Sequence, residues 1–231
     1  MEKQMSESFF VASILAMVGG FFDAYTYICR DQVFANAQTG NIVRVSMTLA
    51  IGDYEKTIRY FIPIMAFCLG VILTMIIRDH YKNQTYIHWR QVILMIEMII
   101  IMIVGWIPVG QMNLVVNIMI SFICAMQAEC FRKVLGKPYS STMCTGNLRS
   151  CSEYLYSSLK NENHLQLRKC VHYLFIILFF MSGAILGVKI TCIWDEKAVW
   201  ICLLPMFIAF SSMFKRSKQL YHCKNDYSII K

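Results

Sequence analysis

Long apolar blocks separated by short polar connections dominate the pattern of this chain. Each block carries little or no charge and is roughly 17–20 residues long, about what a helix needs to cross ~30 Å of hydrocarbon. Backbone groups in lipid must be satisfied within their own segment, which favours helices. The pattern therefore predicts six membrane-spanning helices, at Phe9–Ile28, Tyr60–Ile77, Val92–Val109, Gln111–Ala128, Cys170–Val188 and Ala198–Phe214.

A polar tripeptide is repeated in register with an acid. Thr-Gly-Asn occurs at Thr39-Gly40-Asn41 and again at Thr145-Gly146-Asn147, and an acid that ends an apolar run precedes each copy, Asp23 and Glu129. A single offset of 106 residues superposes both the tripeptides and the acids. This repeat predicts two copies of one unit, each with a polar element at membrane depth.

The match between the two halves continues beyond the tripeptides. Phe67-x-x-Gly70-x-Ile72-Leu73 aligns with Phe180-x-x-Gly183-x-Ile185-Leu186. We therefore expect a single membrane domain over residues 1–231, with repeats at 9–109 and 111–214 and a basic tail at 215–231. Because each repeat has three spans, the second enters the membrane from the opposite side, as in the inverted repeats typical of secondary transporters.

The charge distribution sets an orientation. With a cytoplasmic N-terminus, sixteen of the 22 Lys and Arg residues fall on the cytoplasmic side. This excess follows the positive-inside rule and predicts that both termini are cytoplasmic. The net charge of +8 therefore reflects membrane topology and does not indicate nucleic-acid binding. The basic tail can also contact anionic lipid headgroups.

The stretches after the tripeptides are too short to span. Ile42–Ile51 and Leu148–Leu159 predict short helices that lie in, or re-enter, the membrane zone. Thr or Asn ahead of such a stretch is an N-cap signal, and Gly permits a tight entry.

Asp23 is the sharpest candidate for chemistry. An intramembrane carboxylate is by default a functional hypothesis, as a proton carrier or cation ligand. It follows Gly19-Gly20, a pair that lets another backbone approach or the helix break. The alternative is a helix-end cap or an ion pair with Arg30 or Arg44.

Three further polar residues have weaker signals. Glu129 is the repeat counterpart of Asp23, but it directly precedes Arg132 and Lys133, so an ion pair at helical spacing explains it equally well. Gln127 is a candidate cavity-lining residue. Glu97 lies near the start of its span, where we expect it to extend to the cytoplasmic surface.

The Thr-Gly-Asn elements place backbone amides at helix starts, an arrangement suited to an anionic group. Arg44 and Arg149, one turn or less beyond Asn41 and Asn147, would reinforce such a site. Simple capping, with nothing bound, remains the alternative.

Catalytic and cofactor signatures are missing from the sequence. It contains no H-E-x-x-H, G-x-S-x-G or Walker-type loop, so we expect no enzymatic activity. None of its ten cysteines form a C-x-x-C pair, which favours small buried residues over a metal or disulfide site. We expect no metal and no cofactor.

Two motif regions resemble the YoaK-type family of bacterial membrane proteins, which is built around a domain of unknown function. The first runs from Gly20-Phe21-Phe22-Asp23-Ala24-Tyr25 through Phe34 to Thr39-Gly40-Asn41; the second comprises Met126-Gln127, Phe131-Arg132-Lys133 and Thr142-Met143-Cys144-Thr145-Gly146-Asn147-Leu148-Arg149. The resemblance implies a polytopic inner-membrane protein of about six spans and supplies no substrate. Where relatives tend to carry amides, this chain has Ala128-Glu129.

These features favour a secondary transporter or permease for a small solute or ion in the bacterial inner membrane, with Asp23 coupling to a proton or cation. A passive channel and a non-transporting scaffold subunit are the alternatives. The expected partners are the lipid bilayer and an unidentified solute; assembly into a homo-oligomer stays open.

Overall fold

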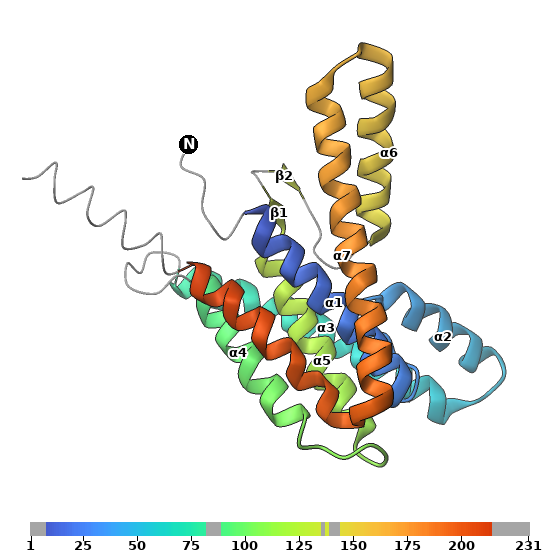
Figure 1. Cartoon of the computed structure of the whole chain (residues 1–231). Coiled ribbons are helices and arrows are strands. Elements are labelled where there is room, and N and C mark those ends of the chain that lie inside the picture. Colours follow the sequence, from blue (N-terminus) through green and yellow to red (C-terminus); the bar gives the residue numbers. More distant parts are fainter. Residues whose placement is uncertain (1–7, 82–88, 135–136, 139–143, 214–231) are drawn as a thin grey trace, which may run out of the picture.

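A computed structural model describes residues 8–81, 89–134, 137–138 and 144–213 as a helical bundle (Figure 1). Thr142 and Met143 of the second motif region, the predicted basic tail and Phe214 lie outside these ranges. The helices are α1 (Phe9–Cys29), α2 (Gln38–Ala50), α3 (Tyr54–Tyr81), α4 (Trp89–Val104), α5 (Asn113–Cys130), α6 (Cys144–Asn161), α7 (His164–Trp194), the 3-10 helix η2 (Asp195–Cys202) and a helix at 203–213. Two short strands, β1 (Lys133–Val134) and β2 (Lys137–Pro138), pair antiparallel between α5 and α6.

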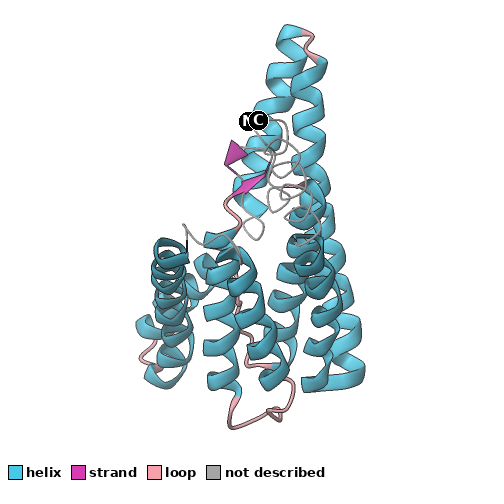
Figure 2. Ribbon diagram, turned by 90° about the vertical axis from the view of Figure 1, so that its left-hand side faces the viewer, coloured by secondary structure: helices cyan, strands magenta, loops and turns pink. Residues whose placement is uncertain are grey.

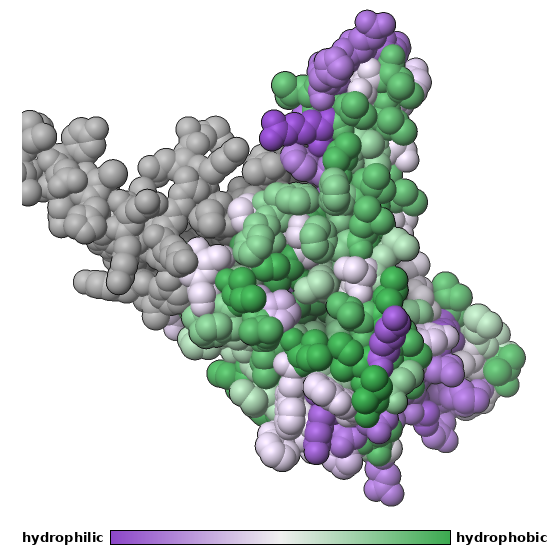
Figure 3. Space-filling view, viewed as in Figure 1, coloured by the Kyte–Doolittle hydropathy of each residue, from purple (hydrophilic) through white to green (hydrophobic). Residues whose placement is uncertain are grey.

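Within the described ranges, four helical runs are long and apolar enough to cross a membrane: α1, α3, α5 and the run from α7 through 213. The last run is no single rod, because the chain reverses at Asp195, whose φ is 45° (Figure 1). Apolar side chains face outward over much of the surface, such as Leu69 and Ile185, each more than half exposed (Figure 3). The expected fold class, an all-helical integral membrane protein, is confirmed at this level.

The short helices begin earlier than the sequence predicts. We expected them to start after the Thr-Gly-Asn motifs, but α2 begins at Gln38 and α6 at Cys144, so both motifs lie in a first helical turn. The predicted capping by Thr39 or Asn41 is wrong, because the N-cap of α2 is Ala37, which makes no side-chain cap bond. The polar side chains of the motif are thereby free to face neighbouring elements.

Glycines allow two pairs of long helices to touch through their backbones. A methyl group at Gly183 of α7 would overlap the carbonyl oxygen of Met17 in α1, and one at Gly20 would overlap that of Phe180. On the other side of the bundle, a methyl group at Gly70 of α3 would overlap the carbonyl oxygen of Phe122 in α5. Small residues permit such close packing in membranes. Gly20 therefore serves backbone approach, and α1 continues through it unbroken.

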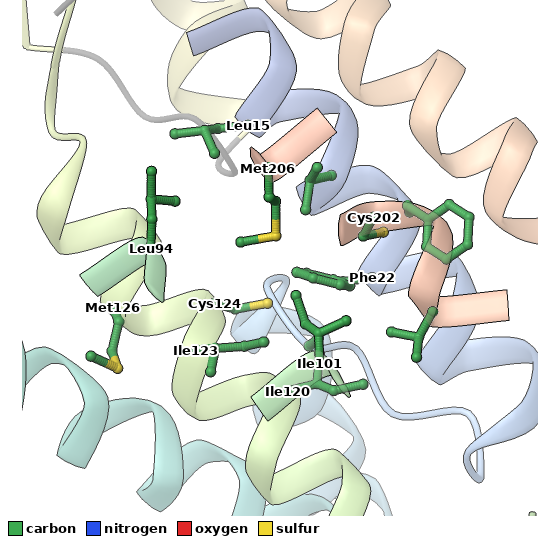
Figure 4. Close-up of a cluster of buried hydrophobic side chains, with 14 of the residues drawn as sticks. Leu15, Phe22, Leu94, Ile101, Ile120, Ile123, Cys124, Met126, Cys202 and Met206 are labelled. Atoms are coloured by element: carbon green, nitrogen blue, oxygen red, sulfur yellow. The ribbon is translucent and has the colours of Figure 1, made fainter. Parts of the chain in front are cut away.

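The core lies between α1, α4, α5 and the last helical segment. Phe22, Ile101, Ile120 and Met206 are fully buried there and converge in Figure 4. By contrast, α6 and the first half of α7 form a hairpin that rises beyond the rest of the bundle (Figure 2). The functional candidates lie between this core and the base of the hairpin.

Candidate functional site

Asp23 is held by the loop that precedes α2. Its side chain lies on α1 and is 7% exposed. The backbone N–H of Asn36 donates to Oδ1 at 2.7 Å, and the amides of Ala35 and Ala37 also act on the carboxylate. The Asn36 side chain donates to the carbonyl oxygen of Gly19 at 3.0 Å, which fastens the loop to α1. The amides at the start of α2, which the sequence offered to an external anion, thus face the protein's own acid.

Neither arginine proposed as an ion-pair partner of Asp23 contacts it. Arg44 donates to the carbonyl oxygen of Gln32 at 2.8 Å and to the hydroxyl of Tyr27 at 3.1 Å. Its guanidinium also lies over the rings of Tyr27, Phe34 and Tyr60, at 5.1–5.6 Å from their centroids. Arg30 faces another part of the protein. The ion-pair alternative for Asp23 is therefore wrong.

Asp23 and both Thr-Gly-Asn motifs border one cavity of about 640 Å³. The first repeat contributes Asp23, Gln38 and Thr39, and the second contributes Thr145 and Gly146. The volume of the cavity falls in the range of small-molecule sites. The remaining lining is mostly apolar: Ala24, Tyr27, Ile28, Phe34, Asn36, Ala37, Phe67, Cys144, Phe180, Ala184 and Val188.

The remaining motif residues are buried or packed close to the loop before α2. Asn41 is fully buried; its Oδ1 accepts from the N–H of Phe34 at 3.0 Å, and its Nδ2 donates to the carbonyl oxygen of Phe34 at 2.7 Å. A methyl group at Gly40 would come within 2.9 Å of the Phe34 ring. Asn147, the repeat counterpart of Asn41, is 2% exposed. The Asn41 amide fixes the loop that carries the Asp23-binding amides.

The other predicted site residues lie away from the cavity. Arg149 is exposed and pairs with Glu153 at 2.8 Å. Glu129 pairs with Arg132 at 3.1 Å, as the ion-pair alternative predicts, and Arg78 of α3 approaches it at 3.7 Å.

Gln127 joins two long helices. It is fully buried, and its Nε2 donates to the carbonyl oxygen of Leu15 at 2.8 Å. Because this bond connects α5 to α1, Gln127 supports the packing of the bundle and lies outside the cavity lining.

Glu97 does not extend to the surface, so that prediction is wrong. The helical face that carries it turns toward the core, and its exposure is 0%. Within the described residues neither carboxyl oxygen has a hydrogen-bond partner. Glu97 and Asp23 both act electrostatically on Cys124, so the two carboxyls share one region of the interior.

Replacing Glu97 by Met is expected to raise the free energy of unfolding by about 1–3 kcal/mol, because it removes a buried polar group without a partner. Thermal unfolding of the purified protein in detergent measures this. The matched Glu153→Met variant removes an exposed acid and should stay within about 0.5 kcal/mol of the parent. A lower stability for Glu97→Met would mean that the carboxyl has a stabilising partner.

Sequence reasoning named Arg30 only as a possible partner of Asp23 and missed its actual role; it is a fully buried arginine at the C-cap of α1. Its guanidinium donates to the carbonyl oxygens of Ile107 at 2.7 Å and Pro108 at 2.9 Å, to Asn113 Oδ1 at 3.1 Å, and to the hydroxyl of Tyr25 at 2.9 Å. It thereby ties α1 to the α4–α5 connection. The only sequence signal was a lone cation at the end of an apolar run.

Replacing Arg30 by Met should lower the free energy of unfolding by about 2 kcal/mol, because it leaves buried carbonyl oxygens without donors. Chemical denaturation in detergent checks this. Arg59→Met, which removes a half-exposed arginine from surface pairs with Glu55 and Asp31, is the matched control and should cost at most about 1 kcal/mol. Equal losses for the two variants would contradict a clamp at Arg30.

Metal and disulfide chemistry find no support among the residues described. They contain no group of three His, Cys, Asp or Glu side chains that could hold a metal ion. Their cysteines are free thiols, although those of Cys151 and Cys170 meet at 3.2 Å between α6 and α7.

Comparison with known proteins yields one family and one curated relative. Residues 11–212 match the model of a family described as "Protein of unknown function (DUF1275)". The chain is 22% identical over 200 residues to the "UPF0700 transmembrane protein YoaK" of Bacillus subtilis (strain 168), an alignment that covers 84% of this chain and 89% of the relative. No solved structure matches the chain.

Proposed function

The chain belongs to the DUF1275 family of membrane proteins, and from that premise we propose that it is a secondary transporter for a small solute. The single observation that carries this proposal is the cavity bordered by Asp23 and by both Thr-Gly-Asn motifs. A site formed at the meeting of two repeats is where secondary transporters bind their substrates.

The second part of the proposal is an inverted repeat of three spans each. Gly70 and Gly183, which align in the sequence, meet the carbonyl oxygens of Phe122 and Met17 respectively. At the offset of 106 residues, Phe122 corresponds to a neighbour of Met17, so the two contacts are nearly equivalent. Each repeat thus packs its first span against the third element of the other, α1 against α7 and α5 against α3. We assign α4 and residues 195–213 as the remaining two spans.

We further propose that α2 and α6 are re-entrant. Residues at their N-terminal ends border the same cavity; from there α2 packs against α3, and α6 runs alongside α7 (Figure 1). Neither is among the runs apolar enough to span. Polar backbone at membrane depth is tolerated where protein or a water-filled cavity surrounds it, which fits their position.

The bacterial inner membrane is the proposed location, with both termini in the cytoplasm. The excess of Lys and Arg on the side of the termini supports this orientation.

Asp23 is the proposed coupling residue. Its carboxylate sits at the cavity wall and is fixed by backbone amides, so a proton or a solute reaching the cavity meets it directly. An intramembrane acid in such a position is suited to exchange protons during transport. Because α1 and α7 touch through their glycines, the side of the cavity that these two helices form would move as a unit.

Reconstituted vesicles that contain a pH-sensitive dye test the proposal. On addition of small solutes from a chemically varied panel, a coupled transporter changes the internal pH for particular solutes. A passive channel predicts solute flux that is indifferent to the proton gradient, and a scaffold predicts none. Either of these two results rejects coupled transport.

A further inference from the structure

The charge balance of the cavity limits what it can bind. Asp23 is the one acidic side chain of the lining, and the described lining residues include no Lys, Arg or His. A charge facing a low-dielectric cavity requires a partner, because isolated charges in such surroundings are costly. The ionised form of Asp23 therefore has backbone amides as donors but no cationic side chain of the described lining as a counter-ion.

The cations that approach the site are directed elsewhere. Arg44 donates to Gln32, Tyr27 and Tyr60 and lies over the Phe34 ring, and it has no contact with Asp23. Arg149 is paired with Glu153 at an exposed position. A proton or a cationic ligand, rather than a side chain of the described residues, is then what neutralises the carboxylate.

The rest of the lining is apolar and aromatic. Tyr27, Phe34, Phe67 and Phe180 border the cavity, together with Ile28 and Val188. Aromatic rings bury apolar groups and attract cations over their faces. Such walls suit a ligand with a hydrocarbon body.

We propose that the cavity binds an organic monocation, its ammonium group against Asp23 and its hydrocarbon body between Phe67 and Phe180. This inference rests on the proposed function and names its substrate class. An anion would be repelled by Asp23, and the amides that could attract it before α2 already face that acid. A neutral solute would form no ion pair with the carboxylate.

An exchange mode follows from this chemistry. A proton and an ammonium ion neutralise the same carboxylate, so they exclude each other at Asp23. The carrier would then move the organic cation in one direction and a proton in the other.

Protection of Cys144 from alkylation tests the inference without requiring transport. This thiol borders the cavity next to Thr145. Three probes share a phenylethyl body and differ in charge: phenethylammonium, phenethyl alcohol and hydrocinnamate. Alkylation of the peptide that contains Cys144 is read by mass spectrometry, with the exposed Cys192 as an internal control.

Phenethylammonium, at about ten times its Kd, should slow alkylation of Cys144 about tenfold and leave that of Cys192 unchanged. Asp23→Asn and Phe67→Leu should each weaken this protection, the second without touching the carboxylate. Equal protection by hydrocinnamate or the alcohol, or no protection by any probe, overturns the inference. Protection without any pH change in vesicles would instead keep the cation site and reject coupled transport.

Discussion

Replacing Asp23 by Asn is expected to reduce solute-driven proton movement to the level of vesicles without protein. The amide side chain can still accept a hydrogen bond from the N–H of Asn36, now 2.7 Å from the carboxylate, so the loop before α2 keeps its position. It cannot take up or release a proton, however, and it carries no charge to balance a cation. The internal pH of reconstituted vesicles reports the result.

Asp53→Asn is the matched control, because Asp53 lies in the turn before α3 and pairs with Lys56 at 2.8 Å, outside the cavity. It should leave proton movement unchanged. Wild-type activity in Asp23→Asn, with a normal elution volume in detergent, would remove Asp23 from the mechanism.

Replacing Gly183 by Leu is expected to prevent α1 and α7 from packing and to abolish the folded protein. Even a single methyl group there would overlap the carbonyl oxygen of Met17, a backbone atom that no side-chain rotation can move. Overpacking typically costs about 1–3 kcal/mol, and a backbone overlap lies at or above the upper end of that range. Gly183→Ala should therefore lower the free energy of unfolding by at least about 3 kcal/mol.

Gly146→Ala gives the opposite expectation and serves as its control. A methyl group at Gly146 meets no atom within 4 Å, and the residue lies in the first turn of α6. Alanine should preserve stability or raise it by up to about 1 kcal/mol through helix propensity. Thermal unfolding in detergent compares the two variants; equal stabilities would contradict the close contact between α1 and α7.

Much of the fold follows from the apolar pattern, because membrane helices must be long and uninterrupted. The helical class and the positions of the four long apolar runs seen in the described residues were predictable on this ground, whereas six separate spans stay a prediction. The starts of α2 and α6 were not, since Thr and Asn usually cap helices, whereas Asn41 here lies inside the first turn and binds the Phe34 backbone. The local preference of Asn for the N-cap position was outweighed by the contact that Asn41 makes with the Phe34 backbone.

The candidate site was predictable in part. The repeat drew attention to Asp23 and to both motifs, which border one cavity. That Glu97 faces the core, or that Arg30 is buried against the α4–α5 connection, depends on which helices pack together. Such long-range contacts leave no local signal in a single sequence. Arg44 and Arg149 were wrongly expected to reinforce the site for the same reason. Their positions relative to the two motifs match in the sequence, but their side chains bind other residues.

The central claim is that Asp23 of the first repeat and the second Thr-Gly-Asn motif share one cavity. Cys144 reports on it directly, because burial and, secondarily, the negative charge of Asp23 raise the pKa of its thiol to about 11. Only the thiolate is alkylated. Removing the charge in Asp23→Asn lowers this pKa, so more thiolate is present at a given pH.

The decisive measurement is therefore the pH dependence of Cys144 alkylation in the parent and in Asp23→Asn, read by mass spectrometry with Asp53→Asn as control. The shared cavity predicts that the profile of Asp23→Asn moves to lower pH while that of Asp53→Asn stays with the parent. Identical profiles for all three proteins would contradict it.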